Sequence, residues 1–136
     1  MTLGSTSGNG ILSYSNSNTM GQSFTATADG QVVEVDVKLV YSISGSSLKI
    51  FEGNTVSGTA AYEQTGISAG SGWQTISLST PFNIDNGQVY TFVITNSSIR
   101  YAYSNTYSGG NFWYNTISYG VFDAAFTISV STTSGS

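Results

Sequence analysis

The chain contains no cysteine and no histidine. Their absence excludes disulfides, thiolate nucleophiles, imidazole bases and His/Cys metal clusters. A glycosidase would need two of the seven carboxylates to face each other across a cleft. Glu34 and Asp36 share a strand face, but they alternate with apolar residues, which indicates a solvated face. We therefore expect a protein that is not an enzyme.

Positive charge is scarce as well. Lys38, Lys49 and Arg100 are the only basic residues, and the formal net charge is −4. Because nucleic acids and anionic membranes attract a positive surface, we expect neither as a partner. No run of about 18 apolar residues is present, so no membrane-spanning segment is expected. A surface of Ser, Thr, Asn and Gly is common in secreted bacterial domains. It predicts an extracellular or cell-surface location, in a protein of bacterial or phage origin.

The ends of the chain hold few residues that could form a core. Residues 1–10 and 131–136 are rich in Gly, Ser and Thr, as linkers are. We predict a flexible N-terminal edge at 1–10, one β-sandwich domain at 11–130 and a flexible tail at 131–136. A length of 136 residues suits a single domain with a substantial core. The linker-like ends also suggest a domain from a longer protein.

Apolar and polar residues alternate with a period of two along most of the chain. Val33, Val35, Val37 and Leu39 are expected on one face of a strand, with charged residues between them. Turn residues separate the strands, and the single proline, Pro81, is expected between two of them. The predicted strands are Gln22–Thr27, Val33–Leu39, Ser47–Phe51, Ala60–Thr65, Trp73–Ser79, Gln88–Thr95, Ile99–Tyr103 and Ala124–Val130.

No window of the sequence has the period of an amphipathic helix. Eight or more short strands without helices predict an all-β fold. We expect an antiparallel β-sandwich of two sheets with a jelly-roll-like arrangement. Asp29-Gly30, between two strand-like runs, is expected to form a tight turn. Large apolar residues on the strands are expected in the core, including Phe24, Phe51, Phe92 and Phe126; Trp73, which begins a strand, is also interpreted as structural.

The stretch from Tyr101 to Phe122 contains eight aromatic residues. Tyr and Trp combine an apolar face with a hydrogen-bonding edge, and Asn adds a donor and an acceptor. This chemistry suits a neutral glycan, and Trp113 and Tyr107 are the members most expected to be exposed. An alternative is that Tyr101, Phe112, Tyr114 and Phe122 pack in the core. The predicted ligand-binding residues are Tyr101, Tyr103, Tyr107, Asn111 and Trp113.

Six sequence segments resemble the all-β modules of secreted and cell-surface proteins of Bacteroidetes-like bacteria. These modules are similar in turn to jelly-roll carbohydrate-binding domains. The resemblance extends from Gly21 to Val130 and implies a β-sandwich, while the ligands of such modules vary. The segments are Gly21–Ala26, Gly30–Leu39, Leu48–Gly53, Trp73–Leu78, Ile84–Phe92 and Asp123–Phe126.

The same resemblance implies a structural Ca²⁺ held by Asp123 at the start of the last strand. Glu52 would be a second oxygen ligand if the loops converge. Ca²⁺ takes six to eight oxygen ligands, and the chain has no dense acidic loop. The alternative is that Asp123 caps a turn or accepts hydrogen bonds from local amides.

Two functions of different classes follow from these observations. The first is a non-catalytic, extracellular glycan-binding or adhesion module whose partner is a neutral glycan or cell-surface polymer. The alternative is a structural or assembly domain of a surface or phage fibre that self-associates. The two differ in oligomeric state, because a fibre domain should associate with copies of itself and an appended module should be monomeric.

Overall fold

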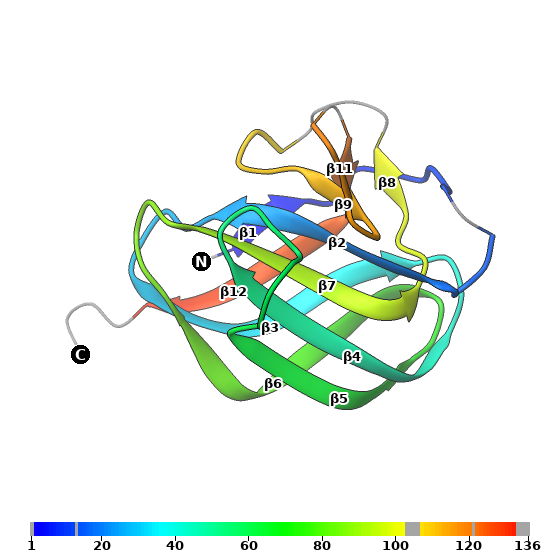
Figure 1. Ribbon diagram of the computed structural model, residues 1–136, viewed down its shortest axis with the longest axis horizontal. Coiled ribbons are helices and arrows are strands. Elements are labelled where there is room, and N and C mark those ends of the chain that lie inside the picture. The colour runs from blue at the N-terminus through cyan, green and yellow to red at the C-terminus, as the bar shows by residue number, and fades with distance from the viewer. Residues whose placement is uncertain (1, 13, 103–106, 121, 133–136) are drawn as a thin grey trace.

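The structure is a computed structural model that describes residues 2–12, 14–102, 107–120 and 122–132 (Figure 1). Strands account for all the regular structure in these ranges, and no helix there could span a membrane. The strands are β1 (Thr2–Ser5), β2 (Asn18–Thr25), β3 (Gly30–Leu39), β4 (Ile43–Glu52), β5 (Tyr62–Ala69), β6 (Gly72–Ile84), β7 (Val89–Ser97), β8 (Tyr101–Ala102), β9 (Phe112–Tyr114), β10 (Ile117–Tyr119), β11 (Asp123–Ala124) and β12 (Phe126–Thr132).

The strands form two antiparallel sheets that pack face to face. One sheet has four strands in the order β1-β12-β3-β6, and the other has six in the order β10-β9-β2-β7-β4-β5. Strands β8 and β11 make a separate two-stranded ladder above one end of the sandwich (Figure 1). The predicted all-β fold with two antiparallel sheets is confirmed.

The strand pairing is that of a jelly roll. β1 pairs with β12, β2 with β7, β3 with β6 and β4 with β5, as in one long hairpin rolled over itself. Strands β8 to β11 are an insertion between β7 and β12, and β9 and β10 extend the six-stranded sheet beyond β2. The aromatic-rich stretch is therefore an addition to the jelly roll, at one end of its larger sheet.

Apolar residues on the facing sides of the sheets form the core. Phe24, Phe92 and Phe126 are fully buried, as the sequence predicts, and Val35 and Val37 line the same layer from β3. Burial of each large apolar side chain stabilises the fold by about 1.5–3 kcal/mol. The residues that alternate with them point to the outer faces of the two sheets.

Four local predictions are wrong. β3 has a β-bulge opposite β12, in which Val33 is the extra residue. The bulge shifts the alternation, so Val32 is buried and Val33 is not. Pro81 lies inside β6, an edge strand, where the pairing with β3 is irregular and a missing N–H is tolerated. Asp29-Gly30 does not form the expected tight turn, because Asp29 lies in a bend and Gly30 already begins β3, which belongs to a different sheet from β2. Part of the supposedly flexible N-terminal edge is β1, which pairs with β12 and buries Leu3.

Candidate functional site

The aromatic run extends the hydrophobic core of the sandwich to the end that carries the β8–β11 ladder. Tyr101 is 3% exposed, and its ring stacks on Phe112 with 5.4 Å between centroids. Phe122 packs against Tyr101 at 5.0 Å and stacks on Tyr119 at 5.6 Å. Burial of Tyr101 and Phe112 matches the alternative in which these aromatics supply stability. Tyr103, another predicted ligand-binding residue, lies outside the described residues.

Tyr107 is half-buried, and its contacts are internal. Its ring packs edge-to-face on Phe126 at 5.3 Å, and its hydroxyl oxygen accepts a hydrogen bond from the Thr25 backbone N–H at 3.2 Å. Burial raises the pKa of the Tyr107 phenol above its ordinary value of 10.0. The Thr25 N–H opposes this rise, and the nearby Asp123 carboxylate adds to it.

Trp113 is 9% exposed, so the expectation that its ring is exposed is wrong. It stands on the outer face of the six-stranded sheet, in β9, opposite Gly21 of β2. Its indole Nε1–H donates a hydrogen bond to Asn54 Oδ1 at 2.9 Å, from the segment that follows β4. This segment and the sheet cover the ring, leaving little of it for a ligand.

Asn111 and the two glycines before it are fastened to β2. The Asn111 backbone N–H donates to Ser23 Oγ at 2.7 Å, and its carbonyl oxygen accepts from the Ser23 backbone N–H at 2.9 Å. The Gly109 carbonyl accepts from the Thr25 hydroxyl at 2.7 Å. These bonds make the stretch a continuation of the sheet, whereas the sequence suggests an adaptable loop.

The two predicted metal ligands do not come together. Asp123 is fully buried; its Oδ1 accepts a hydrogen bond from Gln22 Nε2 at 2.7 Å, and its Oδ2 accepts one from the Tyr107 backbone N–H at 2.9 Å. Glu52 is exposed at the end of β4 and shares a surface depression with Asp85. Within the described ranges, no three Asp or Glu residues are placed to hold a metal ion. Asp123 acts as an internal hydrogen-bond acceptor, which was the alternative to a metal ligand.

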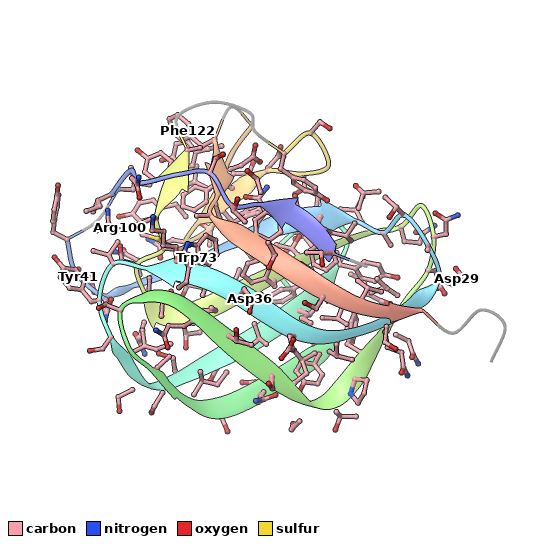
Figure 2. All side chains as sticks on the ribbon, turned by 180° about the vertical axis from the view of Figure 1, so that it is seen from behind. Asp29, Asp36, Tyr41, Trp73, Arg100 and Phe122 are labelled. Atoms are coloured by element: carbon pink, nitrogen blue, oxygen red, sulfur yellow. The ribbon has the colours of Figure 1, made fainter. Side chains whose placement is uncertain are left out.

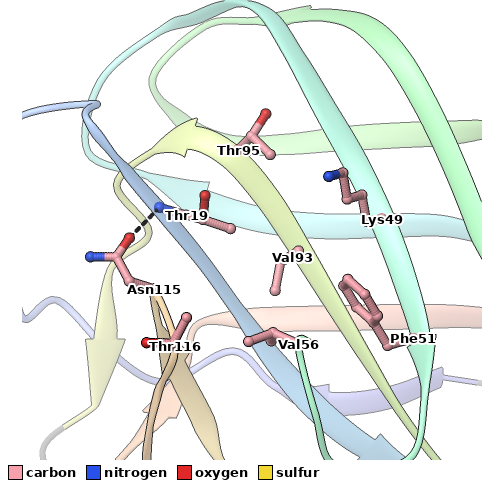
Figure 3. A pocket seen from close by; sticks show the side chains of 8 residues that line it. All are labelled: Thr19, Lys49, Phe51, Val56, Val93, Thr95, Asn115 and Thr116. Atoms are coloured by element: carbon pink, nitrogen blue, oxygen red, sulfur yellow. Dashed lines mark hydrogen bonds between the residues drawn. The ribbon is translucent and has the colours of Figure 1, made fainter. Parts of the chain in front are cut away.

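The outer face of the six-stranded sheet carries a groove of about 280 Å³ (Figure 3). Phe51 and Val93 lie at its base but are only 5% and 2% exposed. Asn115, in the β9–β10 turn, closes one side and accepts a hydrogen bond from the Thr19 backbone N–H at 2.9 Å. The groove is polar at its rim and offers no exposed aromatic ring.

A second groove of about 280 Å³ lies on the outer face of the four-stranded sheet, which faces the viewer in Figure 2. Trp73, on β6, is 42% exposed, so its ring is available to a ligand. The groove is lined by Thr6, Asp36, Trp73, Gln74, Thr75 and Thr127.

Strand register places the polar residues of this groove side by side. Asp36 of β3 lies opposite Thr75 of β6 and Thr127 of β12, and Lys38 lies opposite Trp73. Directly opposite residues of antiparallel strands point to the same face, with Cβ atoms about 4.5–5.5 Å apart. The next row repeats the pattern, with Glu34 between two serines.

The Asp36 carboxylate is only partly satisfied. Its Oδ2 accepts a hydrogen bond from the Thr127 hydroxyl at 2.9 Å. Its Oδ1 is covered and has no hydrogen-bond partner within the part of the chain that the structure describes. An acceptor left in this state costs about 1–3 kcal/mol. A ligand that donates to Asp36 Oδ1 would recover this free energy, which requires the side chains that cover this atom to move aside.

The phase of β6 in the sequence is a signal for this groove. Trp73, Thr75 and Ser77 alternate with Gln74, Ile76 and Leu78. A period of two therefore places Trp73 on the polar face of its strand, whereas the apolar Ile76 points to the other face. The expectation that Trp73 is structural rests on residue type, and the strand phase and its exposure of 42% correct it.

Comparison of this chain with models of protein families, with curated proteins and with solved structures gave no match.

Proposed function

We propose that this domain binds glycan without catalysis, through the groove at Trp73 and Asp36. The observation that carries the proposal is an exposed indole ring beside a carboxylate oxygen that has no partner among the described residues. The apolar face of a sugar ring can cover the indole, while two of its hydroxyls donate to the carboxylate and to the neighbouring threonines. This proposal keeps the function expected from the sequence and moves the site to the other sheet.

The size and surroundings of the groove support a sugar as the ligand. Its volume of about 280 Å³ is near the lower limit of small-molecule pockets, about 300 Å³, so it accommodates a single small ring. Thr75 and Thr127 flank Asp36, and Ser77 and Ser129 flank Glu34 in the next row. This strip of hydroxyl and carboxylate groups continues along the sheet from Trp73, as a ligand of several linked sugars would require.

The test begins with a glycan array, followed by titration of the glycans that bind. In the Trp113→Phe background, Trp73 is the only tryptophan, so a change in its fluorescence reports contact with the ligand. We expect Trp73→Ala to abolish binding without unfolding the domain, because the ring lies on the outer face of the sheet and outside the hydrophobic core. Asp36→Asn should weaken binding about five- to tenfold, since charged acceptors bind hydroxyls more strongly than neutral ones.

Ile117→Ala is the control, because Ile117 is 55% exposed on β10 of the opposite sheet. It should bind as the native protein does. Unchanged binding by Trp73→Ala would contradict the proposed site. In that case, loss of binding by Asn115→Ala would locate the ligand in the groove of Figure 3 instead.

A further inference from the structure

Two of the three basic residues of this chain meet next to the Trp73 groove. Lys38, at the end of β3, and Arg100, after β7, are adjacent through a backbone hydrogen bond from Arg100 N–H to the Lys38 carbonyl at 2.8 Å. Both side chains reach Asn9: Lys38 Nζ donates to its Oδ1, and Arg100 Nη1 donates to its backbone oxygen at 2.9 Å.

These two cations line a surface depression that adjoins the Trp73 groove. The depression has a volume of about 410 Å³, and its lining includes Asn9, Lys38, Ser71, Gly72 and Arg100. Gly72 directly precedes Trp73 in the chain, and Lys38 lies opposite Trp73 in the sheet. Figure 2 shows Arg100, Trp73 and Asp36 in succession along the same face of the molecule. A ligand seated on Trp73 therefore has Asp36 on one side and the two cations on the other.

The charge of this corner is unlike that of the chain as a whole. The formal net charge is −4, yet here an ammonium and a guanidinium group share the neutral Asn9 as a hydrogen-bond acceptor. An ammonium group has three N–H donors and a guanidinium group has five, so each has donors beyond the one given to Asn9. An anion placed between them would relieve the repulsion of the two like charges and accept these donors.

We propose that Lys38 and Arg100 form an anion subsite of the same binding face, so that the preferred glycan is acidic. The ligand carries a carboxylate, as in a uronic acid, or a sulfate ester on the sugar next to the one at Trp73. Its hydroxyls meet Asp36 and its anionic group meets the two cations. This inference rests on the proposed glycan binding and narrows its ligand class. It replaces the neutral ligand expected from composition, because the fold collects in one place charges that are far apart in the sequence.

The chain supplies a matched control in its third base, Lys49, which lies on the outer face of the other sheet. Lys38→Gln, Arg100→Gln and Lys49→Gln each remove one positive charge. We would titrate each variant with an oligosaccharide that contains a uronic acid, with a sulfated one and with a neutral one of the same length. The first two substitutions should each weaken binding of an acidic glycan about fivefold, the upper range for an exposed charge pair, and Lys49→Gln should not.

Salt and inorganic sulfate provide independent measurements. Binding of the acidic glycan should weaken as NaCl rises from about 0.05 M to about 0.5 M, because the ions screen exposed charges. Sulfate alone should shift the backbone amide signals of Gly72 and Arg100 in NMR spectra, and it should do so in Trp73→Ala as well. The acidic probe that binds more tightly identifies the anionic group.

The outcomes separate this inference from the proposed function. Equal affinity for neutral and acidic glycans, indifferent to salt and to both substitutions, would overturn the anion subsite and leave glycan binding intact. Sulfate-induced shifts at Gly72 and Arg100 without binding of any glycan would overturn glycan binding and support the anion subsite. Equal weakening by Lys38→Gln and Lys49→Gln would indicate an effect of net charge and would also overturn the subsite.

Discussion

Tyr107 is one of the residues that attach the insertion to the jelly roll. Its backbone N–H donates to Asp123 Oδ2, its hydroxyl oxygen accepts from the Thr25 N–H, and its ring packs on Phe126 of β12. Gln22 completes the connection, since its side chain donates to Asp123 Oδ1 and accepts from the Ala124 N–H. The described hydrogen bonds of this buried network join β2, β11 and the start of the Tyr107 segment.

The raised pKa of Tyr107 predicts sensitivity to alkaline pH. In the unfolded chain the phenol ionises near 10.0, whereas the folded protein retains the proton to higher pH. The stabilisation is therefore fully present below about pH 10 and is lost as pH rises through the folded-state pKa. Melting temperatures of the native protein and of Tyr107→Phe, compared from about pH 8 to about pH 11, should converge as the pH rises. At pH 8 the variant should be less stable by about 1–3 kcal/mol, because Thr25 N–H loses its acceptor. A difference in melting temperature between the two proteins that stays the same at every pH would contradict this prediction.

The two tryptophans show where sequence reasoning at single residues fails. Trp113 stands two residues after Gly109-Gly110-Asn111, a sequence that suggests a loop. In the structure it lies opposite Gly21 and donates to Asn54, and both contacts depend on the fold. Trp73 looked like a core residue and is 42% exposed. Strand phase alone would have placed Trp73 correctly, whereas no local pattern reveals that Asn54 reaches Trp113.

At the scale of elements, the junction of β2 and the β9 segment requires a glycine. A Cβ atom on Gly110 would lie 1.8 Å from the Ser23 carbonyl oxygen, far inside any contact distance. The close approach allows the hydrogen bonds between Ser23 and Asn111 that attach the segment to the sheet. Gly110 is therefore needed for packing and does not serve a flexible loop.

Gly110→Ala should destabilise the protein by about 1–3 kcal/mol, the usual cost of an overpacked contact. Gly120→Ala is the control from the same insertion, because the nearest atom to its added Cβ would be Asn111 Oδ1 at an ordinary 3.8 Å. It should be neutral or slightly stabilising. Denaturant midpoints of both variants give the measurement. A loss of stability in Gly120→Ala that equals the loss in Gly110→Ala would show that the clash with Ser23 is not the cause.

Long strands could be predicted from the sequence, and short ones could not. β3 and β7 lie where the period of two indicated them. β1 holds one buried apolar residue, Leu3, which is too little for a local signal, and it forms because β12 offers an edge to pair with. The prediction of a tight turn at Asp29-Gly30 is wrong because a local pattern does not show which strands pair. The two residues suit a turn between paired strands, but the flanking strands belong to different sheets.

For the whole molecule, the sandwich has four edge strands, β1 and β6 in one sheet and β10 and β5 in the other. β1 and β10 are short edges of four and three residues. Gln64 of β5 covers the edge of β6: its Nε2 donates to the Ser77 carbonyl at 3.2 Å, and its Oε1 accepts from the Ser79 N–H at 2.9 Å. β5 carries Glu63, and its pairing with β4 is interrupted by register shifts. Short, covered, charged or irregular edges hinder pairing with a second copy.

These edges predict a monomer, which distinguishes the binding module from the self-associating fibre domain. The mass measured by light scattering after size exclusion should be 14.3 kDa at every concentration tested. Gln64→Ala would uncover Ser77 and Ser79 on β6 and should favour association at high concentration, because backbone groups on an exposed edge pair readily with another strand. Tyr41→Ala is the control, because Tyr41 is exposed and lies outside the strands. A native protein that forms a stable oligomer would contradict the role given to these edges. It would favour the fibre hypothesis, since the surface that copies then share would be unavailable to a separate ligand.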